Sequence, residues 1–437
     1  MEVTIHRGSR EIGGSCVELR SGDGRIVLDV GKPLPKPGTS HSDRRKWEQI
    51  PGPELYEMEY IPRVEGLYEW QEPTVTGVLI SHAHQDHYGF VNYVHPKVPV
   101  YLGEGTKRLI ELTTQFTRSE IHLKNPQVFS WPGKFAVGEF HVTPHLVDHS
   151  SFGAFAFEIE ARGKRIFYSG DFRGHGYLGK TLDIIARKCA SGVDALIMEG
   201  TMLGRKDEQV LTEQDLADEA KGICKDCPKA VLVYHSGQNV SRAVSFYKAA
   251  RSSGREFVLD VYTAHVLAEL GQCKGGDNLP YPGNLPGIRV WYPNRLTGRL
   301  KKEGQGAIIY RFGKSRYKMS RNDMPARLDK IMLYVRPGME FDLGRITGID
   351  GSVLLYSLWK GYREEDSTKK FLDSLHGLGI SERYLHTSGH APIPDLQRLV
   401  DTIKPKRLFP IHTEYPEDFE QFRVPVGKIE DGVPVEL

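Results

Sequence analysis

A dense group of potential metal ligands follows a short apolar run near the start of the chain. The stretch "SHAHQDHYGF" covers residues 81 to 90 and comes directly after "TVTGVLI". Alternate side chains of an extended strand share one face, so His82 and His84 would lie together before the chain turns into a helix carrying Asp86 and His87. Imidazole nitrogen and carboxylate oxygen suit zinc, with manganese or iron as competitors. The pattern therefore predicts His82 and His84 on one metal, and Asp86 and His87 on a second.

Two metals need more ligands than this stretch supplies, so others must come from distant segments. Three His or Asp residues stand at the ends of apolar runs: His149 after "VTPHLVD", Asp171 after "RIFYSG" and His412 after "RLFPI". Strand ends and the loops that follow them often place functional groups on a rigid scaffold. We expect these three residues to complete the metal sites.

The order of strands and helices predicts an α/β fold with more than one domain. Up to Glu199, short β-rich runs alternate with turns and enclose two helical candidates, which is typical of an α/β sandwich. Alternating strands and helices then predict a separate small parallel sheet. The chain of 437 residues, with 39% hydrophobic residues and a net charge of +2, is of ordinary globular composition. Without a signal peptide or a long apolar run, we expect a soluble, cytoplasmic protein that does not enter membranes.

The five cysteines do not indicate a disulfide framework, because their number is odd and they are scattered. Cys224 and Cys227 form a single CxxC, whereas a structural zinc site needs a second pair or two histidines at defined spacing. We interpret them as thiols near a helix end.

Several motifs together resemble those of a known family. In chain order they are "GSREIGGSCVEL", "LDVGKP", "SHAHQDHYGF", "VDHSSFGAFAFEIE", "YSGDFRGHG", "MEGT", "HTSGHA" and "LFPIHTE", which span residues 8 to 414. The chain resembles the metallo-β-lactamase superfamily and, within it, the β-CASP nucleases, which include ribonuclease J, the cleavage and polyadenylation endonuclease subunit and the Artemis-type DNA nucleases. HxHxDH alone indicates the superfamily, and "MEGT", "HTSGHA" and "PIHTE" indicate the β-CASP branch.

The resemblance implies an αββα metallo-β-lactamase sandwich with an inserted β-CASP α/β domain. The first part of the sandwich would cover residues 1–200, the inserted domain 201–350 would close over the active site as a lid, and the return segment would cover 351–437. The chain ends soon after His412, where bacterial ribonuclease J carries a further C-terminal domain used in dimerisation. A homodimer is therefore left open.

The resemblance also implies roles for individual residues. One metal would be held by His82, His84 and His149, and the second by Asp86, His87 and His412, with Asp171 bridging the two. Asp29 and Glu199 would orient the ligands, and His386, Ser388 and His390 would lie at the scissile phosphate. The implied cofactors are two zinc ions, with manganese as an alternative.

The chemistry of such a centre agrees with phosphodiester hydrolysis. Two metals bound there would lower the pKa of water for attack on phosphorus, Asp86 could accept a proton from that water, and His390 is suited to protonate the leaving 3′-oxygen. Ser236 lies in "YHSGQNVSRAVSFY", where a strand, a turn and a helix start could offer donors to a phosphate. The same signals also fit a plain helix cap.

A strongly basic segment points to the class of substrate. Residues 289–321 hold ten Lys or Arg side chains against one acid, Glu303, and they include five aromatic residues, namely Trp291, Tyr292, Tyr310, Phe312 and Tyr317. Basic side chains for phosphates and aromatic rings for stacking predict a channel for a single strand. The alternative is a solvated basic face with core aromatic residues.

The favoured function is a two-metal nuclease acting on single-stranded nucleic acid, with RNA preferred over DNA because "HTSGHA" resembles ribonuclease J more than Artemis-type enzymes. Exonuclease and endonuclease modes are both open. Alternatives are a DNA nuclease of the same family, a small-molecule metallohydrolase of the lactonase or thioesterase type, and a catalytically inactive nucleic-acid-binding subunit. The last is disfavoured because every ligand position is filled.

Overall fold

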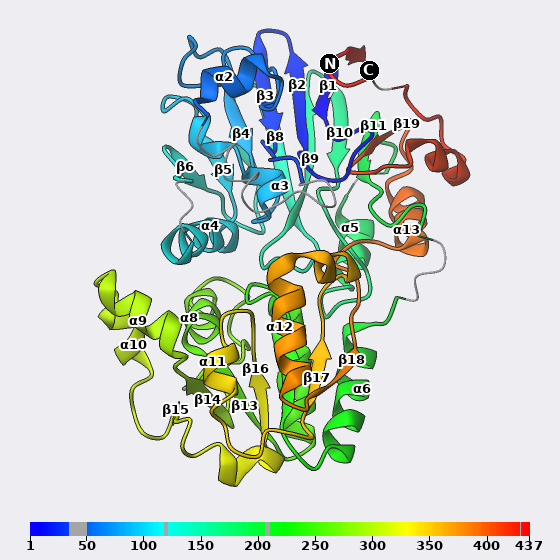
Figure 1. Ribbon diagram of the computed structural model, residues 1–437. Helices are drawn as coiled ribbons and strands as arrows, with labels where there is room; N and C mark the ends of the chain where they lie inside the picture. Colours follow the sequence, from blue (N-terminus) through cyan, green and yellow to red (C-terminus); the bar gives the residue numbers. More distant parts are fainter. Residues whose placement is uncertain (35–49, 118–120, 190, 206–209, 429) are drawn as a thin grey trace. The chain divides into compact units, whose positions relative to one another are not determined.

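The chain divides into two compact units. The computed structural model describes residues 1–34, 50–117, 121–189, 191–205, 210–428 and 430–437 (Figure 1). The first unit consists of Met1–Gln209 and Gly389–Leu437, and the second of Val210–Ser388. Both termini belong to the first unit, where β1 pairs with β20.

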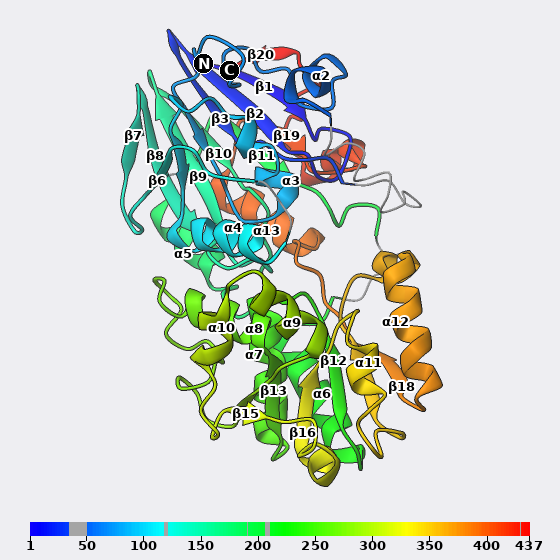
Figure 2. The same cartoon turned by 60° about the vertical axis from the view of Figure 1, so that its left-hand side comes forward.

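The first unit contains two mixed sheets. The seven-stranded sheet has the order β20-β1-β2-β3-β4-β5-β6 and the six-stranded sheet the order β19-β11-β10-β9-β8-β7 (Figure 2). The first sheet comprises β1 Glu2–Arg7, β2 Cys16–Ser21, β3 Gly24–Leu28, β4 Gly77–Leu79, β5 Val100–Leu102, β6 Pro126–Val128 and β20 Pro434–Glu436. The second comprises β7 Phe135–Val137, β8 Phe140–Leu146, β9 Phe155–Ala161, β10 Lys164–Tyr168, β11 Ala195–Glu199 and β19 Arg407–Ile411.

The two sheets enclose the main core of the first unit. Apolar residues of both sheets, such as Leu28 and Phe157, form one buried cluster. The other face of the second sheet carries Phe167 and Leu196, which belong to a separate cluster with Leu399 of α13 and with residues of α5. A sheet buried on both faces needs apolar side chains on both, as these alternating positions provide. The layered α/β sandwich predicted from the sequence is therefore confirmed.

The second unit is built on a seven-stranded parallel sheet of order β15-β14-β13-β16-β12-β17-β18. Its strands are β12 Val231–Tyr234, β13 Glu256–Asp260, β14 Ile288–Trp291, β15 Lys318–Met319, β16 Ile331–Tyr334, β17 Val353–Tyr356 and β18 Ser381–Tyr384. Parallel sheets are stable only when both faces are covered. The apolar runs of β12, β16 and β17 are accordingly buried.

Among the residues that the structure describes, the helices of both units are at most 14 residues long. Those of the first unit are α2 Gly52–Glu57, α3 Gln85–Tyr88, η1 Val91–Tyr93, α4 Glu104–Phe116, α5 Thr181–Lys188, α13 Ile393–Ile403 and η4 Pro416–Phe422. Those of the second are α6 Glu213–Asp226, α7 Val240–Ser252, α8 Val261–Leu270, α9 Asn294–Lys302, α10 Gly306–Arg311, η2 Pro325–Lys330, α11 Glu340–Leu343, η3 Lys360–Glu364 and α12 Asp366–Gly377. Within the described ranges, none of them combines the length and apolar character needed to cross a membrane.

The return to the first unit comes later than the sequence indicated. Residues 351–388 were expected to belong to the sandwich, but β17 pairs with β12 in the parallel sheet and β18 pairs with β17. The chain re-enters the first unit at Gly389. The apolar run of β17 is buried in the second unit, and the run alone does not say which of two sheets receives it.

Candidate metal centre

The HxHxDH stretch changes from extended chain to helix within four residues. After β4 ends at Leu79, His84 still has extended backbone angles (φ −102°, ψ 142°) and stands directly before α3. His82 and His84 therefore turn to the same side, with His82 Nε2 3.1 Å from His84 Nδ1. Asp86 and His87 lie on the single turn of α3.

Two N-terminal loops hold α3 in place through its backbone. Ser15 N donates to the carbonyl of Asp86 at 3.0 Å, and Val30 N donates to that of His87 at 2.8 Å. Gly31 lies so close that a Cβ atom there would stand 1.8 Å from the Asp86 carbonyl oxygen. The glycine in "LDVGKP" is thus required by a close approach to the ligand-bearing helix.

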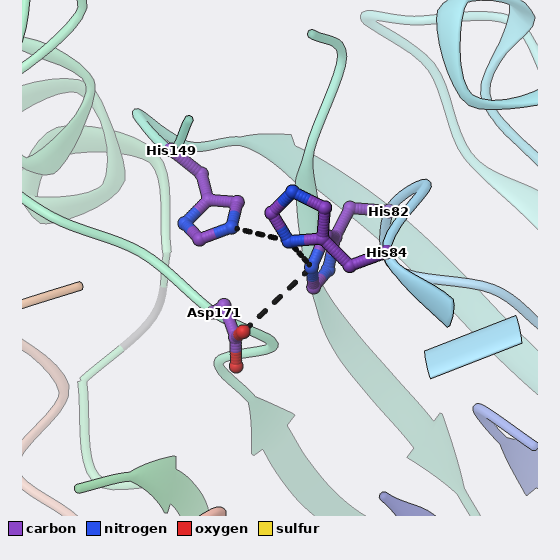
Figure 3. Close-up of side chains that lie close together, drawn as sticks. All are labelled: His82, His84, His149 and Asp171. Carbon is purple, nitrogen blue, oxygen red and sulfur yellow. Dashed lines mark hydrogen bonds and ion pairs between the residues drawn. The ribbon is translucent and has the colours of Figure 1, made fainter. Parts of the chain in front are cut away.

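A first group of ligand atoms comes from three strand ends. His82, His84, His149 and Asp171 each direct one nitrogen or oxygen into a space where these atoms all lie within 4.8 Å of one another (Figure 3). His149 Nε2 is 3.1 Å from His84 Nδ1, and His82 Nε2 is 3.6 Å from Asp171 Oδ2. Three imidazoles and a carboxylate form a donor set that suits zinc.

A second group adjoins the first through Asp171. Asp86, His87 and His412 bring their ligand atoms together, with His412 Nε2 3.1 Å from Asp86 Oδ2. Asp171 Oδ2 lies 3.1 Å from His87 Nε2 in this group as well as 3.6 Å from His82 in the first. The structure thus brings all seven predicted ligands together, and Asp171 lies between the two groups.

Three of the histidines have Nδ1 in contact with a supporting oxygen atom. Nε2 is therefore the ring nitrogen that faces the ligand groups. His87 Nδ1 lies 2.8 Å from Asp29 Oδ2, His412 Nδ1 lies 2.8 Å from Thr201 Oγ1, and His149 Nδ1 lies 2.6 Å from the Gly389 carbonyl oxygen. Such contacts select the tautomer and fix the ring plane of a metal-ligating histidine. In each case Nε2 is left to point at the ligand group.

Asp29 is the most heavily engaged of these supporting residues. Besides His87, its carboxylate accepts hydrogen bonds from Ser81 N, Ser81 Oγ and Tyr168 Oη, each at 2.7 Å. Its φ of 58° is unusual for a residue other than glycine, as is the φ of 53° at His412. Backbone strain of this kind costs of order 1–3 kcal/mol and persists only where surrounding contacts enforce it.

Comparisons with known proteins identify this architecture. Residues 51–235 match the β-lactamase superfamily domain, and residues 381–421 match the Zn-dependent metallo-hydrolase RNA specificity domain. The chain belongs to the metallo-β-lactamase superfamily. Its buried cluster of His and Asp residues is the candidate metal site of that superfamily of hydrolases.

Two curated relatives and one solved structure extend the comparison. The chain is 25% identical to ribonuclease J of Sinorhizobium meliloti over 89% of its own length and 67% of that protein. It is 22% identical to ribonuclease J of Helicobacter pylori strain B128 over 95% of its own length but only 56% of that protein. A crystal structure of a protein of unknown function from Enterococcus faecalis V583 shares the fold over 100% of this chain and 99% of that chain, with a TM-score of 0.77 and 23% identity.

The electrostatics of the metallo-β-lactamase centre favour ligand forms that bind metal. Burial drives the pKa values of His82 and His149 well below the usual range for histidine and lowers that of His84 to about 4. Burial raises the pKa of Asp171, but the neighbouring His412 and His87 outweigh it and hold that pKa well below its ordinary value. Neutral imidazoles and an ionised carboxylate are the forms in which these groups coordinate a metal ion.

The pKa of His87 is shifted in the opposite direction, because two carboxylates flank its ring. Burial lowers its pKa, whereas the charges of Asp171 and Asp29 raise it well above the ordinary value. The position therefore attracts a positive charge. A metal ion would replace that proton, as expected for metal binding coupled to proton release.

The hydrogen bonding of the ligand atoms is consistent with a metal site. Among the described residues, His87 Nε2 and both carboxylate oxygens of Asp171 are buried and make no hydrogen bond of regular geometry, although His87 Nε2 lies 3.1 Å from Asp171 Oδ2. Buried polar atoms without partners are rare in folded proteins because each costs desolvation free energy. Metal ions in this space would satisfy all three atoms.

Glu199 and His390 adjoin the second group. Glu199 Oε1 accepts from Phe172 N at 2.9 Å, and Glu199 Oε2 lies 3.1 Å from His390 Nδ1. Burial lowers the pKa of His390, but the charges of Glu199 and Asp171 raise it overall. Asp171, Glu199, His390 and His412 also form a group whose ligand atoms lie within 4.8 Å of one another. Glu199 thus contacts His390, whereas the resemblance implied that it orients the metal ligands in general.

The residues predicted to bind phosphate belong to the second unit. Arg242 NH1 lies 3.4 Å from His386 Nδ1, and because a guanidinium only donates, Nδ1 is the acceptor and the neutral ring carries its proton on Nε2. Ser388 is buried, and Ser236 is exposed in the turn before α7. The cap of α7 is Asn239, whose side chain accepts from Arg242 N at 3.0 Å, so a phosphate role for Ser236 stays a prediction.

Some supporting residues were not singled out from the sequence. Tyr168, Ser81 and Thr201 contact Asp29 or His412 but carry no metal-ligand chemistry of their own. All three lie inside quoted motifs, Ser81 in "SHAHQDHYGF", Tyr168 in "YSGDFRGHG" and Thr201 in "MEGT", which was the available signal. The contact of His149 with the backbone carbonyl of Gly389 could not be predicted from the sequence, because any residue carries such a carbonyl.

Replacing Asp29 by asparagine should weaken metal binding without removing a ligand. The amide cannot accept from His87 Nδ1, Ser81 and Tyr168 at once as a carboxylate does, so the ring of His87 loses its fixed orientation. We expect the metal affinity to fall by about 10- to 100-fold, measured by competition with a chromophoric chelator. Asp183→Asn, at an exposed carboxylate of α5 paired with Arg398, is the matched control. Unchanged affinity in Asp29→Asn would contradict the assigned role.

Proposed function

We propose that this chain is a metal-dependent nuclease that hydrolyses phosphodiester bonds of single-stranded RNA. The observation that carries the proposal is the convergence of seven His and Asp ligands into two groups that share Asp171. The match of residues 381–421 to an RNA specificity domain and the similarity to ribonuclease J support RNA as the substrate. Small-molecule hydrolysis would not need a second unit with a basic segment.

The ligand groups define which residues would hold the cofactors. His82, His84 and His149 would hold one zinc ion, Asp86, His87 and His412 would hold the second, and Asp171 would contact both. Metal ions bound there supply Lewis acidity toward a phosphodiester and lower the pKa of water.

Protein side chains would then handle the protons of the reaction. A water molecule attacks phosphorus and gives a proton to Asp86, while the bond from phosphorus to the 3′-oxygen breaks and that oxygen takes a proton from His390. The products carry a 5′-phosphate and a 3′-hydroxyl. The contact between His390 Nδ1 and Glu199 holds the ring so that Nε2 is the atom that transfers the proton.

The basic segment 289–321 supports a polyanionic substrate. Its exposed cations are Arg295, Lys301, Lys302, Arg311, Lys314, Arg316 and Lys318. Of the aromatic residues expected to stack on bases, Trp291 and Phe312 are 2% and 3% exposed, so that expectation is wrong for these two. Both side chains are buried inside the second unit, whereas Tyr310 is 79% exposed. The segment therefore fits contacts to the phosphate backbone better than extensive stacking.

The proposal is tested with 5′-labelled single-stranded RNA and DNA of one sequence, bearing 5′-hydroxyl, 5′-monophosphate or 5′-triphosphate ends. We expect cleavage of RNA that requires zinc or manganese and that falls roughly 100-fold or more in His390→Ala, because a general acid is lost. His141→Ala, at an exposed histidine of β8, serves as the control. Intact RNA beside turnover of a lactone, a thioester or nitrocefin would refute the nuclease proposal.

A further inference from the structure

Three aromatic side chains of the second unit are exposed around the carboxyl ends of two neighbouring strands. Trp359 and Tyr362 follow β17 and are 41% and 45% exposed, and Tyr384 ends β18 and is 37% exposed. We refer to Trp359, Tyr362 and Tyr384 as the aromatic platform. Large aromatic side chains usually lie in the core, so a group of exposed ones marks a surface that binds something.

Packing holds the platform rings in defined positions. Trp359 and Tyr362 meet edge to face, with ring centroids 5.7 Å apart. Gly361 leaves room for the indole, since a Cβ atom there would stand 1.9 Å from it. Tyr384 stacks on the buried ring of Tyr356 at 6.2 Å. The rings are therefore pre-organised, which lowers the entropic cost of binding a ligand.

Cationic and polar groups connect the platform to the predicted phosphate contact. Lys360 Nζ lies 5.0 Å from the centroid of the Tyr384 ring. The ring of His386 follows at 6.1 Å from that of Tyr384. Arg242 holds together the two backbone segments that carry these side chains. It donates to the carbonyl of Ser357 at 3.1 Å and to the carbonyl of Thr387 at 2.9 Å.

The chemistry of this surface fits one kind of ligand. Aromatic rings stack on any nucleobase, a lysine beside them neutralises phosphate, and a histidine that carries its proton on Nε2 can donate to a phosphate oxygen. Tyr384 and His386 also fall within residues 381–421, the stretch that matches the RNA specificity domain. An apolar protein partner would not require Lys360 and His386 among the rings.

We propose that Trp359, Tyr362 and Tyr384 form a base-stacking subsite for single-stranded RNA, beside a phosphate contact made by His386. This inference rests on the proposed function and deepens it. The subsite binds substrate and takes no part in bond cleavage, so it sets the affinity for the strand rather than the rate of the chemical step.

The test compares Trp359→Ala and Tyr384→Ala with the wild-type full-length chain. Binding of a labelled oligouridylate is followed by fluorescence anisotropy with the metals removed, and cleavage is followed on the same RNA and on bis(p-nitrophenyl) phosphate. We expect the dissociation constant and KM for RNA to rise about tenfold or more in each variant, with hydrolysis of the small phosphodiester unchanged. Trp359→Phe should retain most of the affinity, and an RNA with abasic sites should bind wild type and Trp359→Ala equally.

Phe341→Ala is the matched control, because Phe341 is a 60% exposed aromatic residue of the same unit with Arg345 against its ring. Wild-type affinity in both platform variants, in a protein that cleaves RNA, would overturn the subsite and leave the proposed function standing. A wild-type chain that neither binds nor cleaves RNA would overturn both. Urea midpoints close to wild type would exclude unfolding as the cause of weaker binding.

Discussion

Asp171→Asn should abolish phosphodiester hydrolysis and reduce the metal content of the protein. Asp171 contributes to both ligand groups, with Oδ2 at 3.1 Å from His87 Nε2 and 3.6 Å from His82 Nε2. An amide offers one neutral oxygen where the carboxylate offers two that share a negative charge, so both metal sites lose a ligand of the right charge. Metal-assisted charge stabilisation is worth several kcal/mol, which corresponds to a fall in rate of about 1000-fold or more.

The measurement pairs the rate of RNA cleavage with elemental analysis of the purified protein. Asp194→Asn provides the same substitution in the same unit, at a carboxylate that pairs with Lys406 and lies outside the ligand groups. We expect it to keep the metal content and rate of the wild type. Retention of two metal ions and full activity by Asp171→Asn would show that the shared carboxylate has been given the wrong role.

The core of this centre could be predicted because its geometry is local. Strand alternation followed by a helix turn was enough to place His82 and His84 on one side and Asp86 and His87 beyond them. The distant ligands His149, Asp171 and His412 could be found because each follows the end of an apolar strand, and strand ends of one sandwich gather at one edge.

The supporting contacts could not be predicted in the same way. The hydrogen bond from Tyr168 to Asp29 depends on which strands of two sheets face each other, and the contact between Thr201 and His412 joins segments 211 residues apart. Neither leaves a periodic signal. The unusual φ values of Asp29 and His412 likewise arise from tertiary contacts and contradict local preference.

Two interpretations were wrong in part because one sequence pattern serves two environments. The buried strand at residues 353–356 suits either a sandwich or a parallel sheet, so the domain boundary was placed too early. Trp291 and Phe312 stand among basic residues, yet they pack in the core, while the exposed Trp359 and Tyr384 lie outside the basic segment. Burial depends on the helix and strand faces that tertiary packing selects, which the spacing of aromatic residues does not report.

Arg242→Met should strongly destabilise the second unit. Arg242 and Glu213 are both 0% exposed, and Arg242 Nε lies 3.2 Å from Glu213 Oε2. Removing the guanidinium leaves the Glu213 carboxylate buried with Ser245 as its neighbour, and leaves the carbonyls of Ser357 and Thr387 without this donor. Breaking a buried pair on one side costs about 3–5 kcal/mol.

The loss of unfolding free energy should be larger for the buried Arg242–Glu213 pair than for an ion pair at the surface. In urea unfolding of the full-length chain, Arg327→Met is the matched control, because Arg327 lies 2.7 Å from Glu256 in a half-exposed pair worth about 0–1 kcal/mol. The double variant Arg242→Met with Glu213→Gln should recover part of the loss, since no unpaired charge is then buried. Arg242 also joins the segments that carry Trp359 and Tyr384, so Arg242→Met should weaken RNA binding under conditions where the unit is still folded. Equal stability of Arg242→Met and Arg327→Met would show that Glu213 is not a buried charge in need of a partner.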